Sequence, residues 1–377
     1  MPSSPIELLQ HLIRIPSVNP DEDGAPEGAG ELRIAQCLEA WLAGPDCRVM
    51  LEEIKPGRPN LIARFAPMDG RPRILFGPHL DTVGINQMTI DPFSGELRDG
   101  KIWGRGASDT KGSMAAMLWA LRENTHRLRD LPVAIDFVAF MGEESGQWGS
   151  KHFAKHHGRD YSFAIAGEPT SLDIVHVTKG SLWATLSARG KAAHSSMPER
   201  GDNAIMKLAR SLDILEKNLQ PKLSKYTHDL LGNCTMNIGT FHGGARANIV
   251  PDSAHAQLDI RLTPQLFEQG GALALLEDTI RELALPISID YAHENPPMET
   301  SVEHPMVQLL LHAREGSKAT GAPWFSDAAH LSNGGIPSVC LGPGSIEQAH
   351  TADEFLKVDD LLAGVAHFSK FIDLLDR

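Results

Sequence analysis

Cysteine is scarce in this sequence, with four residues among 377, and no two of them form a C-x-x-C pair. Their scattered positions exclude a disulfide framework or a thiolate zinc knot as the organising feature of the fold. We therefore expect ordinary thiols in a reducing compartment. The four residues are Cys37, Cys47, Cys234 and Cys340.

Long apolar runs and clusters of positive charge are also missing. No run approaches the ~20 apolar residues that a transmembrane helix needs. The first residues lack the basic start, the apolar stretch and the small-residue cleavage site of a signal peptide, so we expect a cytoplasmic protein. The formal net charge of −13 argues against nucleic acids and anionic membranes as partners, because both bind clustered Lys and Arg.

The first half of the chain has the pattern of an α/β domain. Apolar runs that predict strands alternate with amphipathic patterns that predict helices, which is typical of a largely parallel sheet. The expected helices cover residues 5–15, 31–42 and 112–122, and the expected strands cover residues 48–54, 60–65, 73–76, 133–140 and 163–166.

The middle of the chain has a different order of elements. We expect a long strand over residues 174–188 with a bend at Gly180, then a helix, two strands, one helix over residues 264–283, and a last strand. This β-α-β-β-α-β order is ferredoxin-like. An α/β pattern returns after residue 304, so we predict a catalytic domain of residues 1–176 and 292–377, with a smaller domain inserted at residues 177–291.

Metal-ligating residue types follow several of the predicted strands. In open α/β sheets, ligands bind beyond the carboxyl ends of the strands. His79 follows strand 73–76, and Asp81 can accept the second ring N–H of that histidine. Asp109 lies in a glycine-rich turn, where its two oxygens can bridge two cations. Taken singly, the histidine also fits a loop and the aspartate also fits a helix cap.

Further candidates follow the later strands. Glu143 and Glu144 come after strand 133–140 and would repel each other without a nearby cation, although a solvated acidic turn is the bland alternative. One of the two can bind metal while the other acts as general base. Glu168 follows strand 163–166, and His350 comes after strand 339–341. Nitrogen and oxygen ligands without thiolate suit catalytic zinc, cobalt or manganese.

The order of these motifs resembles a known family of zinc amidohydrolases. H-x-D, S-D-T-K-G, E-E-S-G, G-E-P-T and A-H-x-x-D-E occur in that order, as in acetylornithine deacetylase, succinyl-diaminopimelate desuccinylase, aminoacylase and carboxypeptidase G. The inserted segment adds A-H-S-S-M-P and H-G-G-A-R-A-N, so the resemblance covers nearly the whole chain. G-E-P-T-S-L and G-P-G-S-I-x-Q-A-H are similar to the acetylornithine deacetylase branch.

The resemblance implies a zinc-exopeptidase-like enzyme with two divalent cations and an N-acyl amino acid substrate. His79 and Glu168 would hold one cation, Glu144 and His350 the other, and Asp109 would bridge both. Glu143 would be the general base, and Asp81 would orient His79. The insert would be a lid that mediates homodimerisation and brings His194 to the partner's active site. The substrate would be bound by Lys179, Asn248 and Arg261.

The sequence departs from the family pattern at two places. Pro78 precedes His79 where the family has glycine, which changes a turn but leaves the ligand in place. Residues 325–328 resemble the wider family more than acetylornithine deacetylase, and this segment borders the pocket in such enzymes. A desuccinylase, a carboxypeptidase G-like enzyme and a dipeptidase therefore remain alternatives. A metal-binding protein without activity would be expected to lack Glu143, and a purely structural protein would not explain five strand-end segments.

Overall fold

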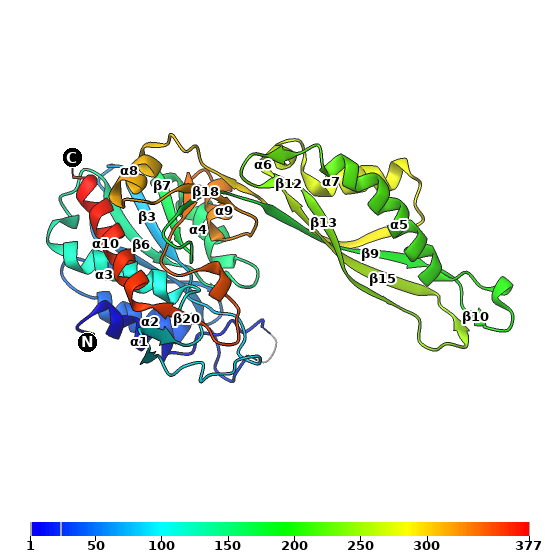
Figure 1. The fold of residues 1–377 in the computed structure, drawn as a ribbon, viewed down its shortest axis with the longest axis horizontal. Coiled ribbons are helices and arrows are strands. Elements are labelled where there is room, and N and C mark those ends of the chain that lie inside the picture. The colour runs from blue at the N-terminus through cyan, green and yellow to red at the C-terminus, as the bar shows by residue number, and fades with distance from the viewer. Residues whose placement is uncertain (1, 23–24, 377) are drawn as a thin grey trace. The chain divides into compact units, whose positions relative to one another are not determined.

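The computed structural model describes residues 2–22 and 25–376, and the chain divides into two compact units (Figure 1). The first unit comprises Met1–His176, Glu299–Thr320 and Ser326–Arg377, and the second comprises Val177–Met298 with Gly321–Phe325. The second unit extends past residue 291 because its last strand continues to Asn295, where it still pairs with Ser181. In the described part of the chain, no helix is long and apolar enough to cross a membrane.

A mixed nine-stranded sheet forms the centre of the first unit, with helices on both of its faces. Its four inner strands run parallel, whereas the flanking strands β1, β2 and β8 pair antiparallel. The mixed, largely parallel α/β sheet predicted from the sequence is therefore confirmed. In sheet order, the strands are β1 (Arg48–Lys55), β2 (Arg58–Arg64), β6 (Ala134–Ala139), β3 (Arg73–Pro78), β7 (Phe163–Gly167), β19 (Ser338–Cys340), β8 (Ile174–Thr178) and β17 (Met298–Glu299), and the ninth, β18 (Ala319–Ala322), pairs with β8.

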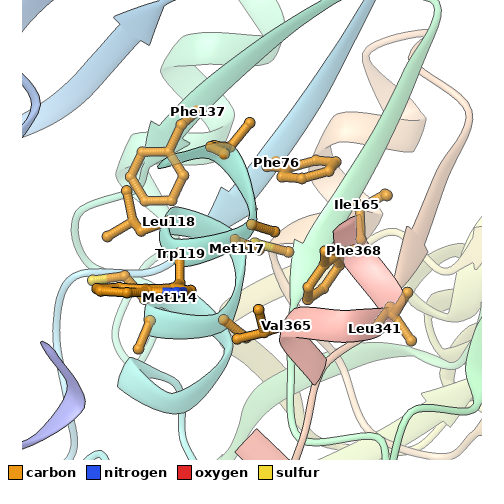
Figure 2. Packing of buried hydrophobic residues seen from close by; sticks show 14 of the residues in the cluster. Phe76, Met114, Met117, Leu118, Trp119, Phe137, Ile165, Leu341, Val365 and Phe368 are labelled. Atoms are coloured by element: carbon orange, nitrogen blue, oxygen red, sulfur yellow. The ribbon is translucent and has the colours of Figure 1, made fainter. Parts of the chain in front are cut away.

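Alternate residues of the inner strands belong to two apolar layers. On one face, Phe76 and Phe137 pack with helices α3 and α10, and the rings of Phe76 and Phe368 lie 5.4 Å apart (Figure 2). On the other face, Leu75 and Val138 pack with helices α4 and α9. Strands buried on both faces consist of nearly continuous apolar residues, which explains their clear signal in the sequence. The helices of the first unit are α1 (Pro5–Ile13), α2 (Leu32–Leu42), α3 (Lys111–Leu128), α4 (Trp148–His157), α8 (Pro305–Ala313), α9 (Asp327–Asn333) and α10 (Val358–Leu374).

The second unit contains an antiparallel four-stranded sheet in the order β13-β15-β9-β16. Leu182, Leu186 and Leu258 form a core with helices α5 and α7, while Trp183 of the same sheet is exposed. The chain order of strands and helices is the predicted β-α-β-β-α-β order. The elements are β9 (Gly180–Arg189), α5 (Ala204–Leu223), β13 (Thr235–Gly243), β15 (Ser253–Leu262), α7 (Gly271–Glu282) and β16 (Ser288–Asn295).

Two predicted elements are each divided in the structure. The strand expected over residues 174–188 is two strands, β8 and β9, separated at Lys179. The single helix expected over residues 264–283 is wrong, because it breaks into α6 (Pro264–Glu268) and α7. Gln269 and Gly270 separate these helices, and Gly270 has a φ angle of 107°, a backbone conformation that favours glycine and interrupts a right-handed helix.

Candidate metal centre

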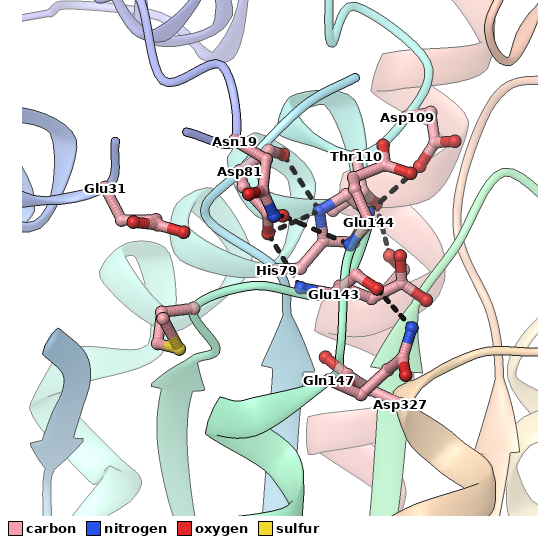
Figure 3. A network of polar contacts seen from close by, with 12 residues as sticks. Asn19, Glu31, His79, Asp81, Asp109, Thr110, Glu143, Glu144, Gln147 and Asp327 are labelled. Atoms are coloured by element: carbon pink, nitrogen blue, oxygen red, sulfur yellow. Dashed lines mark hydrogen bonds and ion pairs between the residues drawn. The ribbon is translucent and has the colours of Figure 1, made fainter. Parts of the chain in front are cut away.

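The predicted ligands of the first unit lie beyond the carboxyl ends of the parallel strands. His79 directly follows β3, Glu143 and Glu144 follow β6, and Glu168 directly follows β7. His79 forms a parallel bridge with Phe140, which aligns the ends of the first two segments. Since parallel strands end at one edge of the sheet, residues that are far apart in the sequence meet there (Figure 3).

Asp109 lies between two histidines. Its Oδ1 is 3.0 Å from His79 Nε2, and its Oδ2 is 3.5 Å from His350 Nε2. The same nitrogen of His350 lies 3.2 Å from Glu144 Oε2. His79, Asp109 and Glu144 each offer a ligand atom, and these atoms lie within 4.8 Å of one another. A carboxylate with one oxygen toward each histidine has the arrangement that a bridging ligand requires.

Asp81 holds the turn that carries the two glutamates. Its Oδ1 accepts a hydrogen bond from the backbone N–H of Glu143 at 3.0 Å, and its Oδ2 accepts one from that of Glu144 at 3.1 Å. His79 Nδ1 lies 2.9 Å from the carbonyl oxygen of Asp81 and 3.6 Å from its carboxylate. Asp81 therefore contacts the His79 ring more closely through its backbone than through its side chain.

Sequence reasoning assigned no role to two residues that belong to this site. Asn19 donates a hydrogen bond from Nδ2 to Asp81 Oδ2 at 2.8 Å, but it lies in a proline- and glycine-rich loop with no signal for such a role. Asp327 is 2% exposed at the start of α9, and Ser150 donates a hydrogen bond to it. Asp327 lies in the segment 325–328, which the family resemblance predicts to border the pocket. The sequence did not indicate that its carboxylate lies near those of the metal centre.

Burial and crowding disfavour negative charge at this site. Burial, and after it the charge of Asp109, raises the pKa of Glu144 to about 7. Burial also raises the pKa values of Glu143 and Glu168 well above their usual range, against the attraction of His79. Hydrogen bonds to Asp109 and Glu144 raise the pKa of His350 to about 10. The carboxylates outnumber the nearby positive charges, which is the environment that a bound cation would stabilise.

The donor atoms fit divalent metal ions. Glu144 Oε1 is buried and accepts no hydrogen bond within the described residues, so an acceptor remains for a cation. Imidazole and carboxylate ligands without thiolate are typical of catalytic zinc and related ions. The structure therefore brings together His79, Asp109, Glu144 and His350. Glu143 and Glu168 lie close enough for charges of this cluster to shift their pKa values.

The predicted substrate residues of the second unit form two groups. His194 on β10 (Ala193–His194) is exposed, and the backbone N–H of Ser195 donates to the carbonyl of Asn248 at 3.1 Å, so His194 and Asn248 lie near each other. Lys179 donates from Nζ to the carbonyl of Asn233, and burial, followed by the charge of Arg261, lowers the pKa of Lys179 against the opposing effect of Cys234. Arg261 forms two hydrogen bonds of 2.9 Å with Asp259.

Sequence comparisons find a matching family model and relatives along nearly the whole chain. A model of the peptidase family M20/M25/M40 matches residues 75–374. An acetylornithine deacetylase from Edwardsiella ictaluri is 32% identical over 371 residues, which cover 94% of this chain and 93% of that protein. A probable succinyl-diaminopimelate desuccinylase from Staphylococcus epidermidis is 27% identical over 393 residues, which cover 95% of this chain and 94% of that protein.

Solved structures share the fold over the full length of the chain. An M20 family metallo-carboxypeptidase from Sulfolobus solfataricus has a TM-score of 0.80 at 21% identity, with 100% of both chains covered. A dinuclear metal-binding peptidase of the M20 family from Bacillus subtilis has a TM-score of 0.68 at 15% identity, with 99% of this chain and 97% of that chain covered.

Proposed function

Because the chain belongs to the peptidase family M20/M25/M40, whose members are metal-dependent amide hydrolases, we propose that it cleaves the amide bond of a small N-acyl amino acid. The observation that carries the proposal is the cluster of two histidines and buried carboxylates at the carboxyl edge of the sheet. Similarity to acetylornithine deacetylases along nearly the whole chain favours an N-acetyl amino acid such as N-acetylornithine.

We further propose that the centre holds two divalent cations, with zinc as the first choice and cobalt or manganese as alternatives. His79 and Glu168 would bind one ion, Glu144 and His350 the other, and Asp109 both. Bound cations of this kind polarise a carbonyl group and make water more acidic. The support is the position of Asp109 between both histidines and the unpartnered oxygen of Glu144.

Glu143 is the proposed general base. It would take a proton from the attacking water at its carboxylate and return it to the nitrogen of the leaving amine. The backbone of Glu143 is fixed on both sides, because its N–H donates to Asp81 and its carbonyl accepts a hydrogen bond of 2.6 Å from Gln147 Nε2. A base on a rigid turn stays aligned with the reacting atoms.

The second unit is proposed to bind the substrate and to act as a lid. Arg261 would bind the α-carboxylate, because a planar guanidinium matches a carboxylate with two parallel hydrogen bonds. In the structure it makes such a pair with Asp259, which also accepts a hydrogen bond from Trp183 Nε1 at 2.9 Å. Lys179 and Asn248 would complete substrate binding. His194 would act in the active site of a partner chain.

A panel of substrates tests this proposal. We expect release of free amine from N-acetyl amino acids, and no turnover of the corresponding amino acid amides, which lack the carboxylate. Arg261→Lys should lower kcat/KM roughly 10–100-fold, as for the loss of a charge-assisted hydrogen bond of ~1.5–3 kcal/mol. Faster release from N-succinyl substrates or from dipeptides would instead favour a desuccinylase or a dipeptidase.

Asp259→Asn is the matched control for Arg261. If the guanidinium serves only the partly exposed ion pair with Asp259, both substitutions should change kcat/KM by the same small factor, because such surface pairs contribute only ~0–1 kcal/mol. If Arg261 binds substrate, Asp259→Asn should leave kcat/KM close to wild type. Equal turnover of the free acid and its amide would contradict the carboxylate anchor.

A further inference from the structure

Glu354 is a completely buried carboxylate, with 0% exposure, four residues after His350 in the sequence. Its Oε2 accepts hydrogen bonds from Arg105 Nη1 and the Gly106 N–H, both at 2.9 Å. Its Oε1 accepts hydrogen bonds from the N–H groups of Ser108 and Asp109, at 2.8 and 3.0 Å. All four donors belong to the turn that carries Asp109.

The turn is shaped to surround this carboxylate. Gly104 and Gly106 have φ angles of 144° and 82°, which favour glycine, and a Cβ at Gly106 would lie 2.9 Å from Thr82 Cγ2. Backbone N–H groups that converge in this way form a concavity that binds anions. Here the anion is a side chain of the same protein, and without it three buried N–H groups would lose their acceptor.

Backbone contacts tie the two segments together on either side of the carboxylate. The Gly104 N–H donates to the carbonyl of Glu354 at 3.0 Å, and Ser108 Oγ donates to the carbonyl of Phe355 at 2.8 Å. The segment that carries His350 is therefore joined to the turn that carries Asp109, and His350 Nε2 lies 3.5 Å from Asp109 Oδ2.

We infer that Glu354 is a positioning residue that sets the position of Asp109 relative to His350 and thereby determines how tightly the centre binds metal. The inference rests on the proposed metal centre. Glu354 itself would not touch metal or substrate, because both of its oxygens are occupied by the turn. Residues that orient metal ligands in this way typically change metal affinity 10–100-fold when they are replaced.

Two substitutions at Glu354 test the inference. Glu354→Gln places an NH₂ group against N–H donors of the turn, so at least one hydrogen bond is replaced by repulsion. Glu354→Asp keeps the charge but is one methylene too short to reach both pairs of donors. Metal-free wild type and variants would be titrated with Zn²⁺ in competition with a chromophoric chelator. We expect affinity to fall roughly 10–100-fold in Glu354→Gln and less in Glu354→Asp.

Asp136→Asn is the control for a general loss of stability. Asp136 is a fully buried carboxylate on β6 that accepts hydrogen bonds from Arg73 and Tyr161 and contacts none of the proposed ligands in the described interactions. The Asp136→Asn substitution should lower the free energy of unfolding, measured with urea, and leave zinc affinity unchanged. A purely structural role for Glu354 predicts the same pattern for its own variants.

The possible outcomes separate the inference from the proposed function. Wild-type zinc affinity in folded Glu354→Gln overturns the inference alone. If Glu354→Gln does not fold, the zinc affinity of folded Glu354→Asp is the test, and a wild-type value overturns the inference. If the wild type binds no zinc, cobalt or manganese, the proposed metal centre is wrong and the inference is overturned with it.

Discussion

At the scale of single residues, the two adjacent glutamates differ in their surroundings. Glu144 Oε2 lies 3.2 Å from His350, and Glu144 is grouped with His79 and Asp109 as a source of ligand atoms. Glu143 is 9% exposed and is not a member of that group. The contact with His350 supports the assignment of Glu144 as a ligand, and the role of Glu143 as the base stays a prediction.

Replacing Glu143 should therefore remove activity without removing metal. We expect Glu143→Ala to lower kcat by ~10²–10⁴-fold, the usual contribution of a positioned base. Metal content after purification without chelator should match that of the wild type, whereas Glu144→Ala should lose metal. Metal loss from Glu143→Ala with retention in Glu144→Ala would mean that the two roles are exchanged.

The sequence indicated these residues because each lies in a short motif at the end of a strong strand. His79, Glu143 and Glu168 follow buried β-strands whose apolar composition is unmistakable. Asn19 could not be found in this way, because its contact with Asp81 joins positions 62 residues apart and depends on the folded loop. Glu354 is the last residue of the A-H-x-x-D-E motif, but its contact with the turn of Asp109 could not be predicted, because its four donors lie about 250 residues upstream.

At the scale of elements, helix α10 is joined to helix α8 by a buried histidine. His367 is 1% exposed, and its Nε2 donates to the carbonyl of Leu310 at 2.8 Å. That carbonyl is in the last turn of α8, where helix carbonyls lack partners within the helix. Burial lowers the pKa of His367 below its ordinary value, against the effect of this hydrogen bond, so the ring is neutral at pH 7 in the folded protein.

This histidine should make stability depend on pH. The folded pKa lies below the unfolded value of about 6.5, so the unfolded chain binds more protons between the two values, and stability falls as pH drops through that window. Glutamine can donate the same hydrogen bond without titrating. Between pH 7.5 and 5.5, urea unfolding of His367→Gln should therefore show a smaller loss of stability than wild type.

The exposed His126 provides the control for that measurement. His126→Gln removes a histidine from the surface of α3 and should leave the wild-type pH dependence unchanged. Identical slopes for wild type and His367→Gln would contradict the neutral, buried assignment of His367.

Long elements could be predicted from the periodic spacing of their apolar residues, whereas short elements could not. Helices α5 and α10 show the apolar spacing of an amphipathic helix over 20 and 17 residues. Strands β4 (Glu96–Arg98), β5 (Lys101–Trp103) and β20 (Phe355–Lys357) have three residues each, too few to show any period. Their positions depend on pairing with one another, which no local pattern records.

At the scale of the whole molecule, the fold class followed from the order of elements, whereas the assembly remains a prediction. We expect a homodimer through the second unit, in which β13 pairs on one side with β15 and is an edge strand of the sheet within the described residues. An unpaired strand edge can add a strand from another chain. The exposed His194 would then reach the active site of the partner.

Mixing two inactive variants tests the trans role of His194. Chains with His194→Ala lack the group that reaches the partner, and chains with Glu143→Ala lack the base. In a heterodimer, one of the two sites would regain both groups, so part of the activity should return after subunit exchange. If no activity returns after subunit exchange is confirmed, His194 does not act in trans. If light scattering shows a monomer, the predicted homodimer is wrong.

The central claim is that this chain hydrolyses amides at a centre of two cations bridged by Asp109. The most direct test is a titration of metal-free protein with Zn²⁺ or Co²⁺, in which bound metal and release of amine from an N-acetyl amino acid are measured together. We predict no activity without metal and a plateau at two equivalents per chain. Full activity in the metal-free protein would contradict the claim, and a plateau at one equivalent would contradict the bridged pair.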